Sequence, residues 1–428
     1  MAPKINFMIK YFLTGLLLTY SLLQAQVPVY TLDQCYDLAR QNYPLIKKHD
    51  LIARSSNYSV ENAGRAYLPQ FSIAGQATYQ SQTIDFQKAI GGGPGLLIPP
   101  LSKDQYKIQA EVNQTIFDGG TIRNQQEMQR ASEASQQQSL EVSLFAVRER
   151  INQLYFSILL IDEQIRQNDI SKSNFQNSAD KARAAYDQGT ALKSNIDEFL
   201  AEIAASEMIG IDLKSNRRAY MDILLVFIGK KVGEELVLEM PPPVVPDPVI
   251  KRPELLLFDL NKKIYDVQEK QLKSNYLPRF DAFVQGAYGR PTLNFIDNDF
   301  GAWWIGGVRM IWNLGSLYTL KNNQTNLKIN KEFLDIDKET FIYNTHLNLN
   351  KESQDIAKYS SLLRQDESVV SLRSSVANAA KAQLDNGVIT VHDYISKMNA
   401  ENLAKQSAIL HSIQLIQAQY QYKNSTGN

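Results

Sequence analysis

The residue types that perform chemistry are few and scattered in this sequence. None of the four histidines has the His-Glu spacing of a zinc protease, and His392 adjoins Asp393 instead of lying one helical turn from it. There is no P-loop, no Gly-x-Ser-x-Gly and no dinucleotide glycine pattern. The eight methionines form no cluster with histidine. We therefore expect no catalysis, no cofactor and no metal site. The histidines are His49, His346, His392 and His411.

Composition excludes further classes of function. Lys plus Arg is 45 and Asp plus Glu is 45, so the chain lacks the basic excess that nucleic acid binding requires. With 44% apolar and 21% charged residues, disorder is not expected. The single cysteine, Cys35, cannot form an internal disulfide, and the residues before it are too polar for a lipid-attachment site. We interpret Cys35 as a helix residue and expect no lipid anchor.

The N-terminus has the pattern of a secretory signal. Lys4 and Lys10 precede and border an apolar stretch at 11–23, and Ala25 offers a cleavage site. We predict a signal peptide at 1–25; the alternative, a membrane anchor, would need roughly 20 apolar residues. No later stretch is long enough for a transmembrane helix, the best being 223–228. An exported chain without such helices is either soluble or a β-barrel.

The sequence repeats one plan at a long period. Asn275-Tyr276-Leu277-Pro278 echoes Ala66-Tyr67-Leu68-Pro69, and a shift of 198 positions carries Gly189 onto Gly387. The same shift aligns a row of apolar residues with heptad spacing at 144–165, which we call the seam, with 342–363. Only half of the seam positions stay apolar in the second copy. Several prolines at 241–248 form a stiff linker. We predict a first repeat at 26–240, a linker at 241–252 and a second repeat at 253–428.

Each predicted repeat has the same internal order. Each begins with a leading helix, at 32–65 in the first repeat, with a break near Pro44, and at 253–274 in the second. A β-hairpin follows, at 70–117 in the first repeat and at 279–313 in the second. A long helical hairpin then follows, at 120–232 or 315–425, with its tip at Gly189 or Gly387. The segments 121–188 and 316–386 contain neither proline nor glycine, and helices of this length suggest a coiled coil or a tall tube.

The predicted strands alternate apolar and polar residues, and aromatic residues gather in the second hairpin. They could form an ordinary soluble sheet or cross a membrane. Four strands cannot close a barrel, which needs about eight, and open edges are not tolerated in lipid. If these strands cross a membrane, several chains must therefore share one barrel. The helices' Asn-, Gln- and Ser-rich faces indicate either ordinary solvated surface or the lining of a wide tube.

These motifs together resemble the TolC-type outer-membrane efflux proteins over nearly the whole mature chain. The resemblance is carried by Thr31-Leu32-Asp33-Gln34, Asn42-Tyr43-Pro44, the paired Tyr-Leu-Pro sites, Ile116-Phe117-Asp118-Gly119-Gly120, Arg252-Pro253-Glu254-Leu255 and the two glycine tips. It implies a mainly α fold with membrane β: a homotrimer whose 12-stranded barrel is continuous with a periplasmic α-helical barrel. It also implies a passive exit duct in the outer membrane, serving efflux or type I secretion with a periplasmic adaptor and an inner-membrane pump.

The resemblance also points to particular residues in the tips. Asp393, six residues after Gly387, stands where the family places its first gating carboxylate, and Ser396 stands where the next would be. Asp197 lies eight residues after Gly189, which predicts a first tip two residues longer than the second. The alternative for Asp393 is a helix cap. For adaptor docking the candidates, which could equally be plain turns, are Tyr186, Gly189, Thr190, Leu384, Gly387 and Val388.

A different class of function remains open at this stage. A periplasmic coiled-coil adaptor or structural protein would also contain a helical hairpin. Two helical hairpins, each preceded by a β-hairpin, favour the duct over this alternative.

Overall fold

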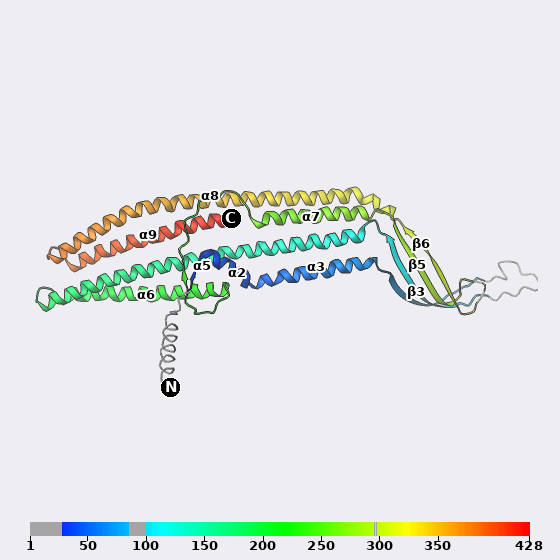
Figure 1. Ribbon diagram of the computed structural model, residues 1–428, viewed down its shortest axis with the longest axis horizontal. Coiled ribbons are helices and arrows are strands. Elements are labelled where there is room, and N and C mark those ends of the chain that lie inside the picture. The colour runs from blue at the N-terminus through cyan, green and yellow to red at the C-terminus, as the bar shows by residue number, and fades with distance from the viewer. Residues whose placement is uncertain (1–27, 85–99, 295, 297) are drawn as a thin grey trace, which may run out of the picture. The chain divides into compact units, whose positions relative to one another are not determined.

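The computed structural model describes residues 28–84, 100–294, 296 and 298–428 (Figure 1). The predicted signal peptide at 1–25 and the glycine-rich stretch at 91–95 lie outside the described residues. Chain contacts divide the protein into two compact units. The helical unit comprises the described parts of Met1–Ile46, Glu141–Pro253 and Ile342–Asn428, and the sheet unit comprises Lys47–Leu140 and Glu254–Phe341. Among the helices of the described residues, none is both long and apolar enough to cross a membrane.

The sheet unit contains one four-stranded antiparallel sheet. Its strands are β2 (Gln70–Tyr79), β3 (Asp104–Phe117), β5 (Arg279–Arg290) and β6 (Gly301–Ile311), in the order β2-β3-β5-β6. The two predicted hairpins are thus joined side by side through β3 and β5, with Ala110 opposite Gly286. The strands β2 and β6 form the two edges of the sheet.

The turn from β3 into the long helix α5 (Thr121–Asp187) explains the Phe-Asp-Gly-Gly motif. The Asp118 carboxylate accepts hydrogen bonds from the backbone N–H groups of Gly120 at 2.9 Å and Ile122 at 2.7 Å, which are unpaired donors at the helix start. Gly119 has φ +69° and Gly120 has φ +89°. A Cβ on Gly119 would lie 2.8 Å from Leu277 Cβ and 2.9 Å from Ser274 O, so this position needs glycine for two reasons.

The corresponding turn from β6 into α8 (Leu317–Asp385) is built differently. A short 3-10 helix, η3 (Leu314–Ser316), connects them without a left-handed residue, and Leu314 stands where the first half has Gly119. The indole N–H of Trp312 donates to Tyr276 O at 3.1 Å and fixes this turn. The echoed motifs are therefore alike in sequence but not in backbone conformation.

Ion pairs join α7 (Pro253–Ser274) to α8 within the sheet unit. Lys338 lies 2.7 Å from Asp259, Lys262 lies 2.7 Å from Asp335, and Lys331 bridges two acidic residues of α7. Single exposed pairs of this kind contribute roughly 0–1 kcal/mol each, so the series fixes the register of the two helices more than it stabilises them.

The leading helix of the first half is broken, as predicted, near Pro44. It consists of α2 (Leu32–Asn42), the short η1 (Pro44–Lys47), α3 (Lys48–Gly64) and the short η2 (Arg65–Tyr67). Proline cannot donate the helical backbone hydrogen bond, and it disfavours helical geometry at the residue before it, Tyr43. Cys35 lies buried on α2, in agreement with its interpretation as a helix residue, and burial raises the pKa of its thiol to about 12.

The main core of the helical unit includes part of the predicted apolar seam of α5 and further apolar residues beside it. Ile151, Tyr155 and Ile158 are almost fully buried against α2, α6 (Lys193–Phe227) and α9 (Val391–Thr426). Two short parallel strands, β1 (Val29–Tyr30) and β4 (Val237–Leu238), border this core. On α8 the buried apolar residues are only Leu349, Ala377 and Ala380, as its half-polar seam predicts.

A second apolar cluster lies nearer the helical tips, and polar residues separate it from the main core along α5. Asn168 donates to Ser206 O at 2.9 Å, and Asn402 donates to Ser171 Oγ at 2.6 Å. These groups lie between the α5 members of the main core, which end at Leu159, and those of the tip cluster, which begin at Phe175. We call this set the polar layer.

We predict that Gly119→Ala destabilises the junction by about 1–3 kcal/mol, because the new Cβ meets two atoms and the backbone has positive φ. Thermal unfolding of the detergent-extracted protein, followed by circular dichroism, measures this. The matched control is Gly315→Ala in the second half, where a Cβ has open space and φ is not positive. Equal effects of the two substitutions would contradict the prediction.

Candidate functional site

The described residues contain no group of three or more His, Cys, Asp and Glu side chains that could hold a metal ion. Among the four histidines, His411 Nδ1 lies 2.6 Å from the Asp366 carboxylate within the helical unit. The features that could serve a function are the two helical tips, in the helical unit, and the two faces of the sheet, in the sheet unit. They are described separately.

Both tips use glycine to end a long helix in the same way. Gly189 has φ +75° and Gly387 has φ +72°. In the first tip the N–H of Thr190 donates to Ala185 O at 2.8 Å, and in the second the N–H of Val388 donates to Gln383 O at 2.8 Å. These are the long-range bonds of a Schellman motif, which satisfies carbonyl groups that the helix end leaves free. The two glycines are thus required by backbone geometry.

The starts of the two returning helices correct the predicted length of the first tip. Helix α6 begins at Lys193, four residues after Gly189, and α9 begins at Val391, four residues after Gly387. The two tips therefore have equal length, and the prediction of two extra residues was wrong. The prediction used Asp197 as the marker, but Asn195 occupies the place that Asp393 has on α9.

Asp393 forms a capping box at the start of α9. Its carboxylate accepts from the Thr390 hydroxyl at 2.7 Å and from the Thr390 N–H at 3.3 Å, and its own N–H donates to Thr390 Oγ1 at 3.1 Å. The hydrogen bonds from Thr390 hold the pKa of the Asp393 carboxyl below its ordinary value of 3.8. Asp393 is therefore ionised at neutral pH. The side chain is exposed, as are Asp197 and Ser396, the other gate candidates.

The two tips share one apolar cluster. Phe175, Phe199, Ala380, Tyr394 and Met398 are buried members from four helices. A cavity of about 550 Å³ opens beside it, and Thr190, Leu384 and Gly387 are among its lining residues. Tyr186, Gly189 and Val388 do not line this cavity and are exposed.

Some cavity residues were not predicted from the sequence. Leu192 and Ile389 follow the glycines closely, so apolar residues just past a helix-ending glycine were the available signal. The ion pair between Lys181 and Asp385, at 3.7 Å, joins α5 to α8. No local sequence pattern indicates that pair, because its members belong to different hairpins.

One face of the sheet is apolar across all four strands. In the observed register, Ile73, Ala110, Gly286 and Trp304 lie side by side on this apolar face. No helix among the described residues covers it: Ile73 is 79% exposed and Trp304 is 73% exposed. Its members are Phe71, Ile73, Gly75, Ala77, Tyr79, Tyr106, Ile108, Ala110, Val112, Phe280, Ala282, Val284, Gly286, Tyr288, Ala302, Trp304, Gly306, Val308 and Met310.

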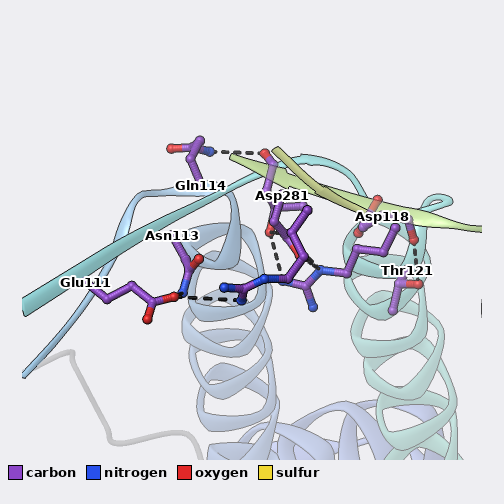
Figure 2. Close-up of polar contacts among 9 residues, drawn as sticks. Glu111, Asn113, Gln114, Asp118, Thr121 and Asp281 are labelled. Atoms are coloured by element: carbon purple, nitrogen blue, oxygen red, sulfur yellow. Dashed lines mark hydrogen bonds and ion pairs between the residues drawn. The ribbon is translucent and has the colours of Figure 1, made fainter. Parts of the chain in front are cut away.

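The opposite, polar face carries the ionisable residues of the strand interiors. Glu111 and Asp281 accept hydrogen bonds from neighbouring polar side chains on this face (Figure 2). Asp104 and Arg290 fall on the apolar side, but they stand at strand ends and form an ion pair with each other. The ionisable residues of the polar face are Lys107, Glu111, Arg279, Asp281 and Arg309.

Comparison with known proteins agrees with this fold. The sequence profile described as outer membrane efflux protein matches residues 35–219. No curated protein matches the sequence.

Solved outer-membrane channels have similar folds at low sequence identity. The outer-membrane channel OprN superposes with a TM-score of 0.65 at 13% identity, covering 92% of this chain and 89% of that one. The outer membrane protein VceC from Vibrio cholerae gives 0.63 at 11%, covering 91% and 95%. The MtrE outer membrane channel of Neisseria gonorrhoeae, solved in its open state, gives 0.64 at 12%, covering 93% and 89%.

These findings agree with the resemblance predicted from the sequence. The profile match covers residues 35–219, and the fold is similar to that of solved outer-membrane channels, as the predicted resemblance to TolC-type outer-membrane efflux proteins implies.

We predict that acid loosens the first turn of α9. The pKa of Asp393 is lowered in the folded chain, so its capping contribution is present above 3.8 and is lost as pH falls through the folded value. Hydrogen exchange of residues 391–394 should accelerate below pH 3.8, after correction for intrinsic rates.

The chain offers its own control for this measurement. The start of α6 has no side-chain cap, because Leu192 precedes it, and its exchange should not show the same acid dependence. Thr390→Val should abolish the dependence in α9. An acid response that persists in this variant would show that another group is responsible.

Proposed function

We propose that the chain is one protomer of a passive exit duct in the outer membrane, serving a tripartite efflux or type I secretion system. The observation that carries this proposal is the sheet: one predominantly apolar, exposed face, one polar face and two open edges. The duct needs no enzyme activity and no cofactor, because transport would be powered by a partner pump.

The two faces of the sheet suit a wall between lipid and water. Strands of a membrane barrel alternate apolar residues toward lipid and polar residues toward the lumen. Here the apolar face carries uncharged residues throughout the strand interiors, whereas Glu111, Asp281 and Arg309 share the other face. The apolar face would contact outer-membrane lipid, and the polar face would line the lumen.

The open edges require further copies of the chain. In hydrocarbon, each unsatisfied backbone group costs several kcal/mol, so the edges at β2 and β6 must both be paired. We infer that β6 of one copy pairs with β2 of the next and that three copies close a 12-stranded barrel. The long helices would then form the periplasmic α-helical barrel of the same homotrimer.

The helical tips would be the docking and gating end. We propose that Tyr186, Gly189, Thr190, Leu384, Gly387 and Val388 contact a periplasmic adaptor that connects the duct to an inner-membrane pump. Ionised Asp393, with Asp197 and Ser396 as further candidates, would line the constriction. Three carboxylates brought together on an axis would attract cations. The capping bonds of Asp393 are compatible with this role, because the side chain stays exposed.

The alternative, a periplasmic coiled-coil adaptor or structural protein, is less well supported. Such a protein would have to cover the apolar face of the sheet with another part of itself, and exposed apolar patches of this extent are unusual on water-soluble chains. Trp304 and Ile73 are instead largely exposed. In the proposed duct this face would contact lipid, in which exposed apolar side chains are favourable.

Planar-bilayer conductance and native mass of the detergent-extracted protein test the proposal. We expect a mass of three copies and discrete channel openings. Ile73→Arg places a charge on the lipid face, at a cost of about 2–4 kcal/mol near mid-membrane, and should abolish outer-membrane accumulation. Ser72→Arg, one residue away on the polar face, is the matched control and should accumulate normally. A stable monomer, or equal tolerance of both substitutions, would refute the duct.

Docking is tested at the second tip. Gly387 has φ +72° with open space around it, so Gly387→Val strains the backbone without a steric clash. We expect cells carrying this variant to lose resistance to exported toxic compounds while the purified protein keeps its channel conductance. Gly387→Asn is the control, because asparagine tolerates a left-handed backbone. Normal export by the valine variant would exclude a docking role for this turn.

A further inference from the structure

On the polar face the carboxylates are largely buried, whereas the arginine side chains are exposed. The side chains of Asp281 and Glu111 are 9% and 17% exposed, whereas those of Arg279 and Arg309 are 55% and 47% exposed. The five ionisable residues of this face comprise three cations and two anions, with Lys107 as the third cation. The charge accessible to a solute at this face is therefore positive.

Each carboxylate is occupied by groups of the sheet itself. Asp281 accepts from the Thr115 hydroxyl at 3.0 Å and from Arg279 Nε at 3.0 Å. Glu111 accepts from Asn113 Nδ2 at 2.7 Å (Figure 2) and from Gln109 Nε2 at 3.2 Å. Carboxylates with these partners have little capacity left to bind a passing cation.

The guanidinium of Arg309 keeps most of its hydrogen-bonding capacity. It lies over the ring of Phe283, 4.5 Å from the centroid, and its nearest approach to Glu111 is 3.8 Å, which is too long for a direct hydrogen bond. Gly307 lies opposite Phe283 in the register and leaves room for the ring. A guanidinium has five N–H donors, and stacking on an aromatic ring leaves its donor edge available.

A second cation is held in a similar way. Lys107 Nζ lies 5.0 Å from the ring centre of Trp303 on the same face. Such cation–π contacts fix the position of a charge without neutralising it, because the ring contributes no counter-charge. Arg309 and Lys107 are thus two cations positioned by aromatic rings, and Arg309 also forms a long ion pair with Glu111 at 3.8 Å.

From this arrangement we propose that the polar face is an oxyanion-binding segment of the duct, with Arg309 as its principal ligand and Lys107 as an auxiliary charge. The proposal rests on the proposed duct, in which this face lines the lumen. Its ligands are solutes bearing a phosphate, sulfonate or carboxylate group, which the guanidinium can bind through two parallel hydrogen bonds. The segment would favour anions, whereas a ring of Asp393 carboxylates at the tips would favour cations.

The first test is ion selectivity in planar bilayers, from the reversal potential across a potassium chloride gradient. Arg309→Gln removes one exposed cation from every copy, and we expect the cation-to-anion permeability ratio to rise about twofold. Lys107→Gln should shift the ratio in the same direction, and it gives an independent measurement if the first variant folds poorly. Asp393→Asn should shift the ratio the opposite way.

The second test separates a binding site from general charge. Pyrophosphate is added to the chamber as the probe, and its block of the chloride current is titrated. Arg309→Lys keeps the charge but loses the planar pair of donors, so we expect unchanged chloride selectivity with roughly tenfold weaker pyrophosphate block. Equal block in the parent and in Arg309→Lys would overturn the oxyanion site.

Failure of this proposal is distinguishable from failure of the duct. A parent protein that forms no channel would refute the proposed function. A parent that conducts, with permeability ratios unchanged by both Arg309→Gln and Lys107→Gln, would refute only the oxyanion segment.

Discussion

Backbone N–H and C=O groups must be paired wherever water is excluded, and the sheet of this chain leaves two rows of them unpaired, along β2 and β6. The apolar face bounded by those edges is suited to lipid and is poorly suited to water. Because of its unpaired edges and its exposed apolar face, the sheet is incomplete in a single copy of the chain. The proposed trimer, its lumen and its lipid contact all follow from the need to close those edges.

Where the chain passes from one element to the next, glycine controls the geometry by two distinct means. At Gly119 a side chain is excluded by the backbone conformation and also by lack of space, because a Cβ would meet Leu277 and Ser274. At Gly189 and Gly387 the surroundings are open, and only the positive φ of the helix end requires glycine. The first kind of glycine holds the strand-to-helix junction rigid, and the second leaves an exposed surface at each tip.

The elements that could be predicted from the sequence are those set by local periodicity and by proline or glycine. The break at Pro44, the helix at 253–274 and the uninterrupted long helices are examples. Pairing of β3 with β5 could not be predicted, because it joins residues some 170 positions apart and no local pattern encodes it. The first tip was predicted too long because Asp197 was used as its marker, whereas α6 begins at Lys193 and Asn195 occupies the place that Asp393 has on α9. The burial of Asp281 beneath Arg279 depends on cross-strand register, which the sequence alone leaves open.

The polar layer of Asn168, Ser171, Ser206 and Asn402 divides the wall of the helical unit into two cooperative folding segments. Apolar contacts are what couple neighbouring turns energetically, and across this layer they are replaced by hydrogen bonds that water can substitute. Separation of the helices around Phe175 and Tyr394 therefore does not require the main core around Tyr155 to loosen. We therefore expect the tips to unfold locally more readily than the larger core, which keeps the helices in register.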